Sequence, residues 1–158
     1  MPVTMEQVRA VLTPEEPDYA QAAGLGPDAL PHLEELVGEP DALLASKAAY
    51  LASLIPDPRS ANVLRKAAGS SRPEVRVAAA SGARNLNRDA ASGVLLPLLG
   101  DRDIGVRKTA LKGVPDEATP ELRTAVESLA DGDSSPGIRA LSDQVRSRLR
   151  PSNDGGQR

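Results

Sequence analysis

Gly100-Asp101-Arg102-Asp103-Ile104-Gly105-Val106-Arg107-Lys108-Thr109-Ala110 carries a pattern that recurs along the chain. A glycine is followed six residues later by an aliphatic residue, usually then by an arginine, and a small residue comes three or four positions further on. The same frame begins at Gly38, Gly69 and Gly132, so that successive glycines are 31, 31 and 32 residues apart. A repeat of this length is typical of stacked supersecondary units, and the sequence therefore predicts a solenoid.

The composition indicates that the stacked units are helical. Tyr19 and Tyr50 are the only aromatic residues in 158, so the core must consist of Leu, Val, Ile and Ala. Such alanine-rich cores belong to close-packed helices, whereas sheets favour aromatic and β-branched side chains. Two inner positions of the second helix in each unit are mostly small, which lets helix axes approach closely. These positions hold Ala48, Ala79, Ala110 and Ser142, and then Leu51, Gly82, Gly113 and Val145.

Each unit is predicted to be a pair of antiparallel helices, and the chain an all-α, short right-handed α-solenoid. The first helices end at the framing glycine and are expected over residues 28–37, 58–68, 89–99 and 120–130. The second helices are expected over 40–55, 73–86, 103–114 and 136–149. We divide the chain into an N-terminal helical cap (1–26), four units (27–56, 57–87, 88–117 and 118–150) and a disordered tail (151–158). The cap lacks the repeat frame, as terminal units of solenoids often do. Its two helices are expected over residues 3–12 and from the capping pattern Thr13-Pro14-Glu15-Glu16 onward.

Charge is distributed unevenly along the chain. Residues 1–45 hold one basic and nine acidic side chains, a net of -8, and the remainder holds 18 basic and 13 acidic side chains, a net of +5. Such polarity can orient the encounter with a charged partner, although solvation of helix surfaces also accounts for it. Cysteine is absent, which suits a reducing compartment, and no apolar run has the length of a membrane span. We therefore expect a soluble cytoplasmic protein.

The repeated unit resembles a HEAT repeat, and its short period resembles the HEAT-like class of phycobilisome lyases. The residues that carry the resemblance are Pro73-Glu74-Val75-Arg76-Val77-Ala78-Ala79-Ala80 and Asp103-Ile104-Gly105-Val106-Arg107-Lys108-Thr109-Ala110-Leu111, with a weaker match at Gly137-Ile138-Arg139-Ala140-Leu141. The resemblance covers roughly residues 27–149. It implies that the second helices line the concave side, and that Arg76, Arg107 and Arg139 pair with inter-helix aspartates or backbone carbonyls of neighbouring units. An anion-binding row is the alternative interpretation of that column. The first unit departs from the pattern, since Ala45 stands where the arginine belongs.

The sequence contains few of the residue patterns that are typical of catalytic sites. The single histidine, His32, has neither a second histidine nor a cysteine with which to bind a metal, so a structural role is expected. Adjacent carboxylates such as Glu34 and Glu35 point about 100° apart on a helix and cannot converge on one substrate atom. No phosphate-binding loop or nucleophile elbow is present. We therefore expect a protein that is not an enzyme and that uses no metal or cofactor.

The remaining candidate is the concave surface. Outward positions of the second helices are expected to bind a protein partner, which makes the chain an interaction, scaffold or adaptor module. These positions are Ser46, Tyr50, Val77, Ser81, Arg84, Lys108, Lys112 and Gln144. Tyr50 is the only aromatic among them, and aromatic residues often anchor interfaces.

Two other functions stay open at this point. One is a HEAT-like lyase or chaperone for a prosthetic group such as a bilin, against which the scarcity of polar and aromatic pocket residues counts. The other is nucleic-acid binding, as in HEAT-like alkylpurine glycosylases. The acidic net charge of -3 and the absence of Trp and Phe for base stacking count against it.

Overall fold

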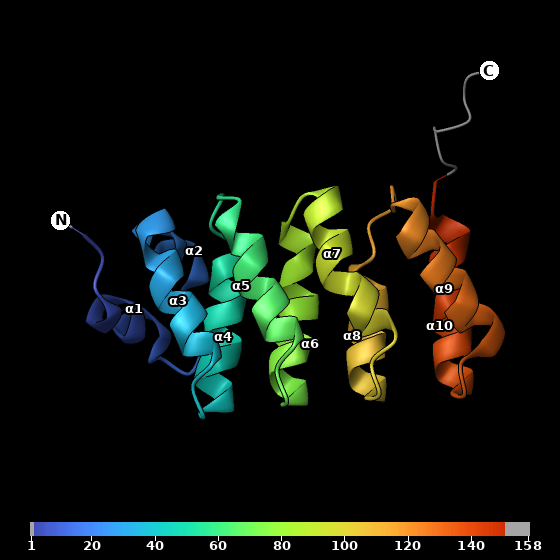
Figure 1. Cartoon of the computed structure of the whole chain (residues 1–158), viewed down its shortest axis with the longest axis horizontal. Helices are drawn as coiled ribbons and strands as arrows, with labels where there is room; N and C mark the ends of the chain where they lie inside the picture. Colours follow the sequence, from blue (N-terminus) through green and yellow to red (C-terminus); the bar gives the residue numbers. More distant parts are fainter. Residues whose placement is uncertain (1, 151–158) are drawn as a thin grey trace, which may run out of the picture.

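The computed structural model describes residues 2–150, and within them the chain forms α-helices and short 3-10 segments with no strand (Figure 1). The predicted disordered tail, 151–158, lies outside the described residues. The first helix, α1 (Met5–Leu12), begins at a capping box in which the Thr4 hydroxyl accepts from the Gln7 N–H and the Gln7 side chain accepts from the Thr4 N–H. This reciprocal arrangement satisfies two backbone donors that the helix itself cannot.

The second helix of the cap starts later than its capping pattern predicts. Residues 13–18 are not helical, and α2 (Tyr19–Ala22) begins at Asp18, whose carboxylate accepts from the Gln21 N–H. The expected start at Thr13-Pro14 was wrong because Pro17 disfavours the α conformation at Glu16, the residue before it. Local signals for a cap are therefore overridden by a proline three residues further on.

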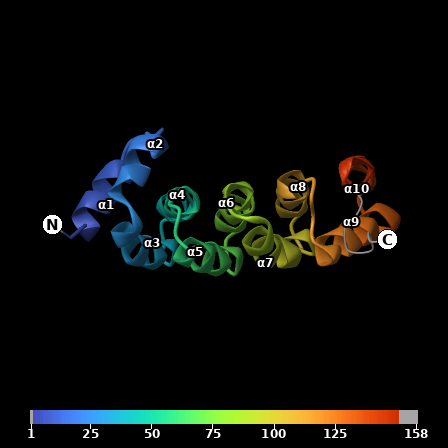
Figure 2. The same ribbon diagram turned by 90° about the horizontal axis from the view of Figure 1, so that it is seen from above.

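Four pairs of antiparallel helices follow the cap in chain order. They are α3 (Leu30–Val37) with α4 (Ala42–Ser53), α5 (Arg59–Ala68) with α6 (Pro73–Gly82), α7 (Arg88–Leu99) with α8 (Ile104–Gly113), and α9 (Pro120–Gly132) with α10 (Pro136–Arg148). Figure 2 shows α3, α5, α7 and α9 in one layer and α4, α6, α8 and α10 in the other, with α2 turned toward the second layer. The chain is thus the all-α solenoid that its repeat predicts.

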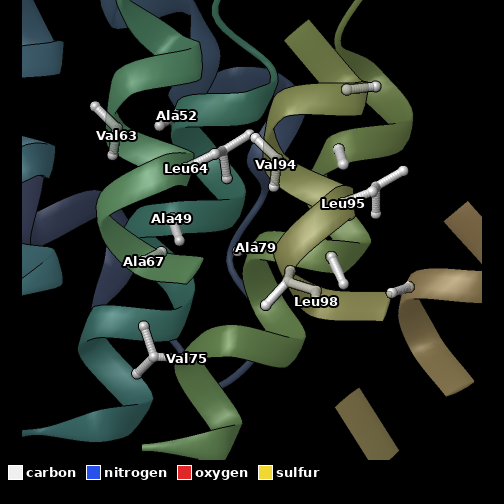
Figure 3. Packing of buried hydrophobic residues seen from close by; sticks show 14 of the residues in the cluster. Ala49, Ala52, Val63, Leu64, Ala67, Val75, Ala79, Val94, Leu95 and Leu98 are labelled. Atoms are coloured by element: carbon white, nitrogen blue, oxygen red, sulfur yellow. The ribbon is translucent and has the colours of Figure 1, made fainter. Parts of the chain in front are cut away.

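One continuous aliphatic core runs between the two layers. Val75, Val106 and Ile138, the aliphatic residues of the repeat frame, are all buried there. Figure 3 shows Leu64 of α5 beside Val94 of α7, between neighbouring units. Each unit leaves one side of its apolar surface uncovered, so the core is stable only when the neighbouring unit is present.

Glycine near the end of a second helix lets successive second helices approach. A Cβ atom on Gly82 would lie 2.9 Å from the Ser53 Cβ and 3.2 Å from a Leu64 methyl group. A Cβ on Gly113 would lie 3.2 Å from the Ala80 carbonyl oxygen of α6. A side chain at Gly82 would therefore require a shift of the neighbouring Ser53, and one at Gly113 would press on the backbone of α6.

Replacement of Gly82 by alanine tests this close approach. We expect Gly82→Ala to lower the free energy of unfolding by about 1–3 kcal/mol, because the added methyl overpacks the contact with Ser53. Gly132 also closes a helix but would meet nothing within 4 Å, so Gly132→Ala is the matched control and should be neutral or slightly stabilising. Urea unfolding followed by circular dichroism measures both, and equal effects would contradict the assignment.

Buried ion pairs connect one unit to the next. Arg76 Nε donates to Asp101 Oδ2 at 2.8 Å and Arg76 Nη2 to Asp101 Oδ1 at 3.0 Å, while the two side chains are only 4% and 8% exposed. Arg107 repeats the arrangement one unit later, with Nε 2.9 Å from Asp133 Oδ2 and Nη2 donating to Oδ1 at 3.3 Å. The structural interpretation of this arginine column is confirmed for both residues.

The ion pair controls the titration of Asp101. Burial raises the pKa of Asp101, but hydrogen bonds from Arg76 and from the Asp103 N–H, with the charges of Arg76 and Arg102, more than offset burial and hold the pKa below its usual value. Stabilisation by a carboxylate with a lowered folded-state pKa is present above its unfolded pKa of about 3.9 and is lost as the pH falls through the folded value. The contact between the second and third units should therefore weaken in acid.

Removing this carboxylate should be costly at neutral pH. We expect Asp101→Asn to destabilise the protein by about 3–5 kcal/mol at pH 7, because the buried Arg76 guanidinium loses its counter-charge. The difference from wild type should shrink as the pH falls below about 4, because the unfolded-state carboxylate is protonated first and the folded-state carboxylate follows at its lowered pKa. Asp131→Asn is the control, since Asp131 is 78% exposed and its pair with Arg146 should contribute at most about 1 kcal/mol. Urea titrations between pH 3 and pH 7 make the measurement; a difference that is independent of pH would refute it.

The cap is attached to the first unit by polar contacts at the ends of α1. The buried Lys47 donates through Nζ to the carbonyls of Leu12, at 3.2 Å, and Pro14, at 2.7 Å. Arg9 forms an ion pair with Glu39, the residue that follows the framing glycine Gly38. His32 Nε2 lies 2.9 Å from the Val3 carbonyl oxygen, which is the structural role expected of it. These contacts cover the N-terminal end of the stack.

Candidate functional site: the groove between α8 and α10

A groove of about 360 Å³ separates the first halves of α8 and α10. Ile104 and Lys108 line it from α8, and Leu141 and Gln144 line it from α10. Ile104 is 53% exposed, one of only two large apolar side chains in the described part of the chain with so much surface in water. This end of the groove is therefore mainly apolar.

The groove continues toward the C-terminal ends of the two helices and becomes basic. A second hollow of about 270 Å³ is bounded by Lys112, Leu141, Gln144, Val145 and Arg148. Lys112 and Arg148 also line a wider hollow of about 640 Å³, which reaches Arg84 and Arg88. Because neighbouring hollows share these residues, they form one surface, which we call the α8–α10 groove.

Helical spacing explains how the lining side chains come to face one another. Ile104, Lys108 and Lys112 are four residues apart and form one stripe along α8. Leu141, Gln144 and Arg148 form the corresponding stripe on α10, with spacings of three and four. Each stripe has its apolar residue near the start of the helix and its basic residue near the end.

Helix α10, the second helix of the fourth unit, differs from α6 and α8 at the position where those helices approach the preceding unit closely. Gly82 and Gly113 occupy this position in the second and third units, and Val145 occupies it in the fourth. Gly113 meets the backbone of α6, whereas the Val145 side chain lines the groove beside α8. The side chain of Val145 takes up space that glycine leaves open at the corresponding positions of α6 and α8, so α10 cannot approach α8 as closely there.

The electrostatic character of the groove is positive. Arg84, Arg88, Lys108 and Lys112 have no carboxylate at ion-pair distance among residues 2–150. Two acidic side chains lie on the rim, and both are paired: Asp116 with Arg148 of the groove itself and Glu117 with Arg150. Arg148 also donates to the Val114 carbonyl at 2.7 Å, which holds its guanidinium at the end of the groove. An anionic group entering the groove would thus meet cations whose charges are not already balanced nearby.

The structure gathers some of the predicted concave residues and separates others. Lys108, Lys112 and Gln144 lie together in the α8–α10 groove, and Arg84 lines its wider part. Sequence reasoning missed other lining residues, among them Ile104, Leu141, Arg148 and Arg88. Ile104 and Arg148 lie one helical turn from predicted residues, four positions before Lys108 and four after Gln144, and this spacing could have identified them.

The other predicted residues lie outside the groove. Tyr50 packs edge-to-face on Tyr19 of the cap, with ring centroids 5.0 Å apart and an angle of 77° between the planes. Burial, and then the neighbouring Tyr50, raise the pKa of Tyr19 above 10.0. The Ser46 hydroxyl is buried without a hydrogen-bond partner among the described residues. Val77 and Ser81 are half-buried on α6. A role for these four residues in partner binding remains a prediction.

Other kinds of site were sought within residues 2–150. No cluster of three or more His, Cys, Asp or Glu side chains there could hold a metal ion. None of the helices in this range combines the length and apolar character needed to cross a membrane. The α8–α10 groove therefore remains the candidate site.

The paired helices, the two layers and the arginine–aspartate ladder define the class of fold: this chain is a HEAT-like helical-repeat solenoid. No family model matches the sequence, and no curated protein matches it either. Among solved structures, a chain in the complex of CpcE and CpcF of phycocyanin lyase from Nostoc sp. PCC7120 is similar, with 25% identity and a TM-score of 0.68. The match covers 90% of this chain and 97% of that one.

This likeness corrects one expectation from the sequence. The chain was expected not to be an enzyme, because no catalytic motif is present; the similar structure, however, is part of a lyase. The absence of a catalytic motif therefore does not support the conclusion that the chain is not an enzyme. The solved structure is also a complex of two proteins, which supports the expectation of a protein partner.

Proposed function

We propose that the chain is a lyase- or chaperone-type HEAT-like protein that holds a carboxylate-bearing prosthetic group, such as a bilin, together with a protein partner. The observation that carries this proposal is the likeness to a phycocyanin lyase chain over nearly the full length of both chains. The α8–α10 groove is where the group would bind.

The chemistry of the groove suits such a ligand. A bilin is an open-chain tetrapyrrole with a long conjugated body and two propionate carboxylates. Ile104 and Leu141 offer apolar contact at one end of the groove, and Lys108, Lys112 and Arg84 offer charge-assisted hydrogen bonds to carboxylates. The successive hollows, of about 360, 270 and 640 Å³, fall largely in the range that small-molecule sites occupy.

Binding would be non-covalent. The chain contains no cysteine, so it has no thiol with which to form a lasting bond to the pigment. Cations at the surface of an open groove hold a carboxylate with modest energy, since solvent screens each pair. A ligand held in this way can be released to an acceptor, which is what a lyase or chaperone requires.

Titration with biliverdin, a bilin with two free propionates, tests the proposal. We expect the visible absorption bands of the pigment to shift on mixing with the full chain, because the groove fixes one conformer of a flexible chromophore. The double substitution Lys108→Gln/Lys112→Gln should weaken binding about two- to thirtyfold, from the loss of two exposed charge pairs. Biliverdin dimethyl ester, which lacks the two charges, should bind the wild type more weakly than biliverdin does.

A matched control is available on the opposite layer. Arg65→Gln/Lys66→Gln removes the same charge from α5 and should leave the affinity unchanged. Absorbance that does not change with either pigment would eliminate bilins as the ligand. Equal weakening by both double substitutions would mean that net charge, and not the groove, attracts the pigment.

A further inference from the structure

The arginine–aspartate ladder continues to the last helix pair, where its last arginine, Arg139, has no carboxylate partner among the described residues, 2–150. Arg76 pairs with Asp101 of the next unit, and Arg107 pairs with Asp133. Arg139 occupies the same position in the fourth unit, seven residues after the framing glycine Gly132. Within residues 2–150, no acidic side chain lies at ion-pair distance from Arg139.

Arg139 is nevertheless anchored in the same way as the two paired arginines. In each unit the Nη1 atom donates to the carbonyl six residues earlier: Ser70 at 3.0 Å for Arg76, Asp101 at 2.9 Å for Arg107 and Asp133 at 2.6 Å for Arg139. The Nε and Nη2 atoms of Arg76 and Arg107 are the ones that meet the carboxylate of the following unit. In Arg139 these two nitrogens make no hydrogen bond within residues 2–150.

We propose that Arg139 is a preformed carboxylate-binding site, and that it docks a second helical-repeat protein end-on. Inside the chain, the carboxylate always belongs to the residue that follows the glycine ending a first helix, as in Gly100-Asp101 and Gly132-Asp133. The same acidic turn on a partner would fit the two free nitrogens, because the planar fork of a guanidinium matches a carboxylate bidentately. This inference concerns the protein partner and does not depend on the pigment.

A second copy of this chain is a poorer partner. Its own acidic turn at the start of the stack, Gly38-Glu39, is already used, since Arg9 of the cap binds Glu39. Its internal aspartates, Asp101 and Asp133, are only 8% and 5% exposed and are paired within the molecule. The two ends of the stack thus differ: the N-terminal end is closed by the cap and the C-terminal end presents an arginine. A different protein must supply the carboxylate.

The surroundings of Arg139 leave it available. Two other carboxylates of the last helix pair, Asp131 and Asp143, are both paired with Arg146. Arg139 is half-buried, so its guanidinium is positioned by its packing and would lose little side-chain freedom on binding. A carboxylate bound there would be partly shielded from water, as in the two internal pairs.

The acidic turn of a partner can be mimicked by duplicating the last helix pair of this chain. We would insert a second copy of residues 119–150 between Arg150 and Pro151 of the full chain, which keeps a glycine spacing of 32 residues and places a Gly-Asp turn 26 residues after Arg139. We expect Arg139→Gln to lower the unfolding midpoint of this extended protein by about 3–10 °C, through loss of a charge-assisted pair. The same substitution should change the midpoint of the unextended chain by less than about 2 °C, since no partner is lost there.

Replacing the aspartate of the inserted turn by asparagine is the matched control and should reproduce the effect of Arg139→Gln, with no further loss in the double variant. An Arg139→Gln effect of equal size with and without the insert would overturn the proposal, because Arg139 would then only support its own unit.

The unextended protein provides an independent readout. Acetate added at constant ionic strength should shift the Nε–Hε NMR signal of Arg139 but not those of Arg76 and Arg107, whose carboxylates are in place. Signals of Arg139 that follow those of the exposed Arg102 would mean ordinary surface binding and would refute a preformed site. Self-association in sedimentation experiments that Arg139→Gln abolishes would refute the choice of a different protein, and would make the partner a second copy.

Discussion

Close contact between successive second helices is the constraint on which the rest of this structure depends. Each unit can bury its apolar side only against its neighbours, so the spacing of the helices sets both the core and the surface. Alanine and glycine at fixed positions keep α4, α6 and α8 close together; a Cβ on Gly82 or Gly113 would clash with the preceding unit. Where Val145 replaces glycine, α10 stands off and the α8–α10 groove opens. The candidate site therefore forms where the close contact between successive second helices, which builds the rest of the stack, is looser.

Much of the architecture could be predicted from the sequence because the same pattern of residues occurs in every unit. Glycine spacing and aliphatic columns predicted all four helix pairs, and the resemblance to HEAT repeats implied the pairing of Arg76 with an inter-helix aspartate, which is Asp101. Features without repetition were harder to predict. The start of α2 was misplaced because a single proline, Pro17, overrides a capping pattern. Nothing in the repeat frame indicates that Tyr50 packs against Tyr19, since Tyr19 belongs to the cap.

The candidate site was only partly predictable for a related reason. Outward positions on a helix can be read from spacing, which is why Lys108, Lys112 and Gln144 were found. Which outward positions share a groove depends on the distance between two helices, and that distance is a property of packing. The expectation that the chain is not an enzyme rested on the absence of catalytic motifs, and the likeness to a lyase structure contradicts it.

The last helix connects the two proposed binding events. Leu141 and Gln144 face the α8–α10 groove, while Arg139, less than one turn earlier on α10, has two nitrogens that make no hydrogen bond within residues 2–150. A partner bound at Arg139 would hold α10 from its outer side, and α10 packs against α9 and α8 only, with no fifth unit to restrain it in the described chain. Such a contact would rigidify one wall of the groove, and a ligand that binds a wall already ordered loses less conformational entropy. Docking and ligand binding would then favour each other by equal free energies, because thermodynamic coupling between two sites is reciprocal.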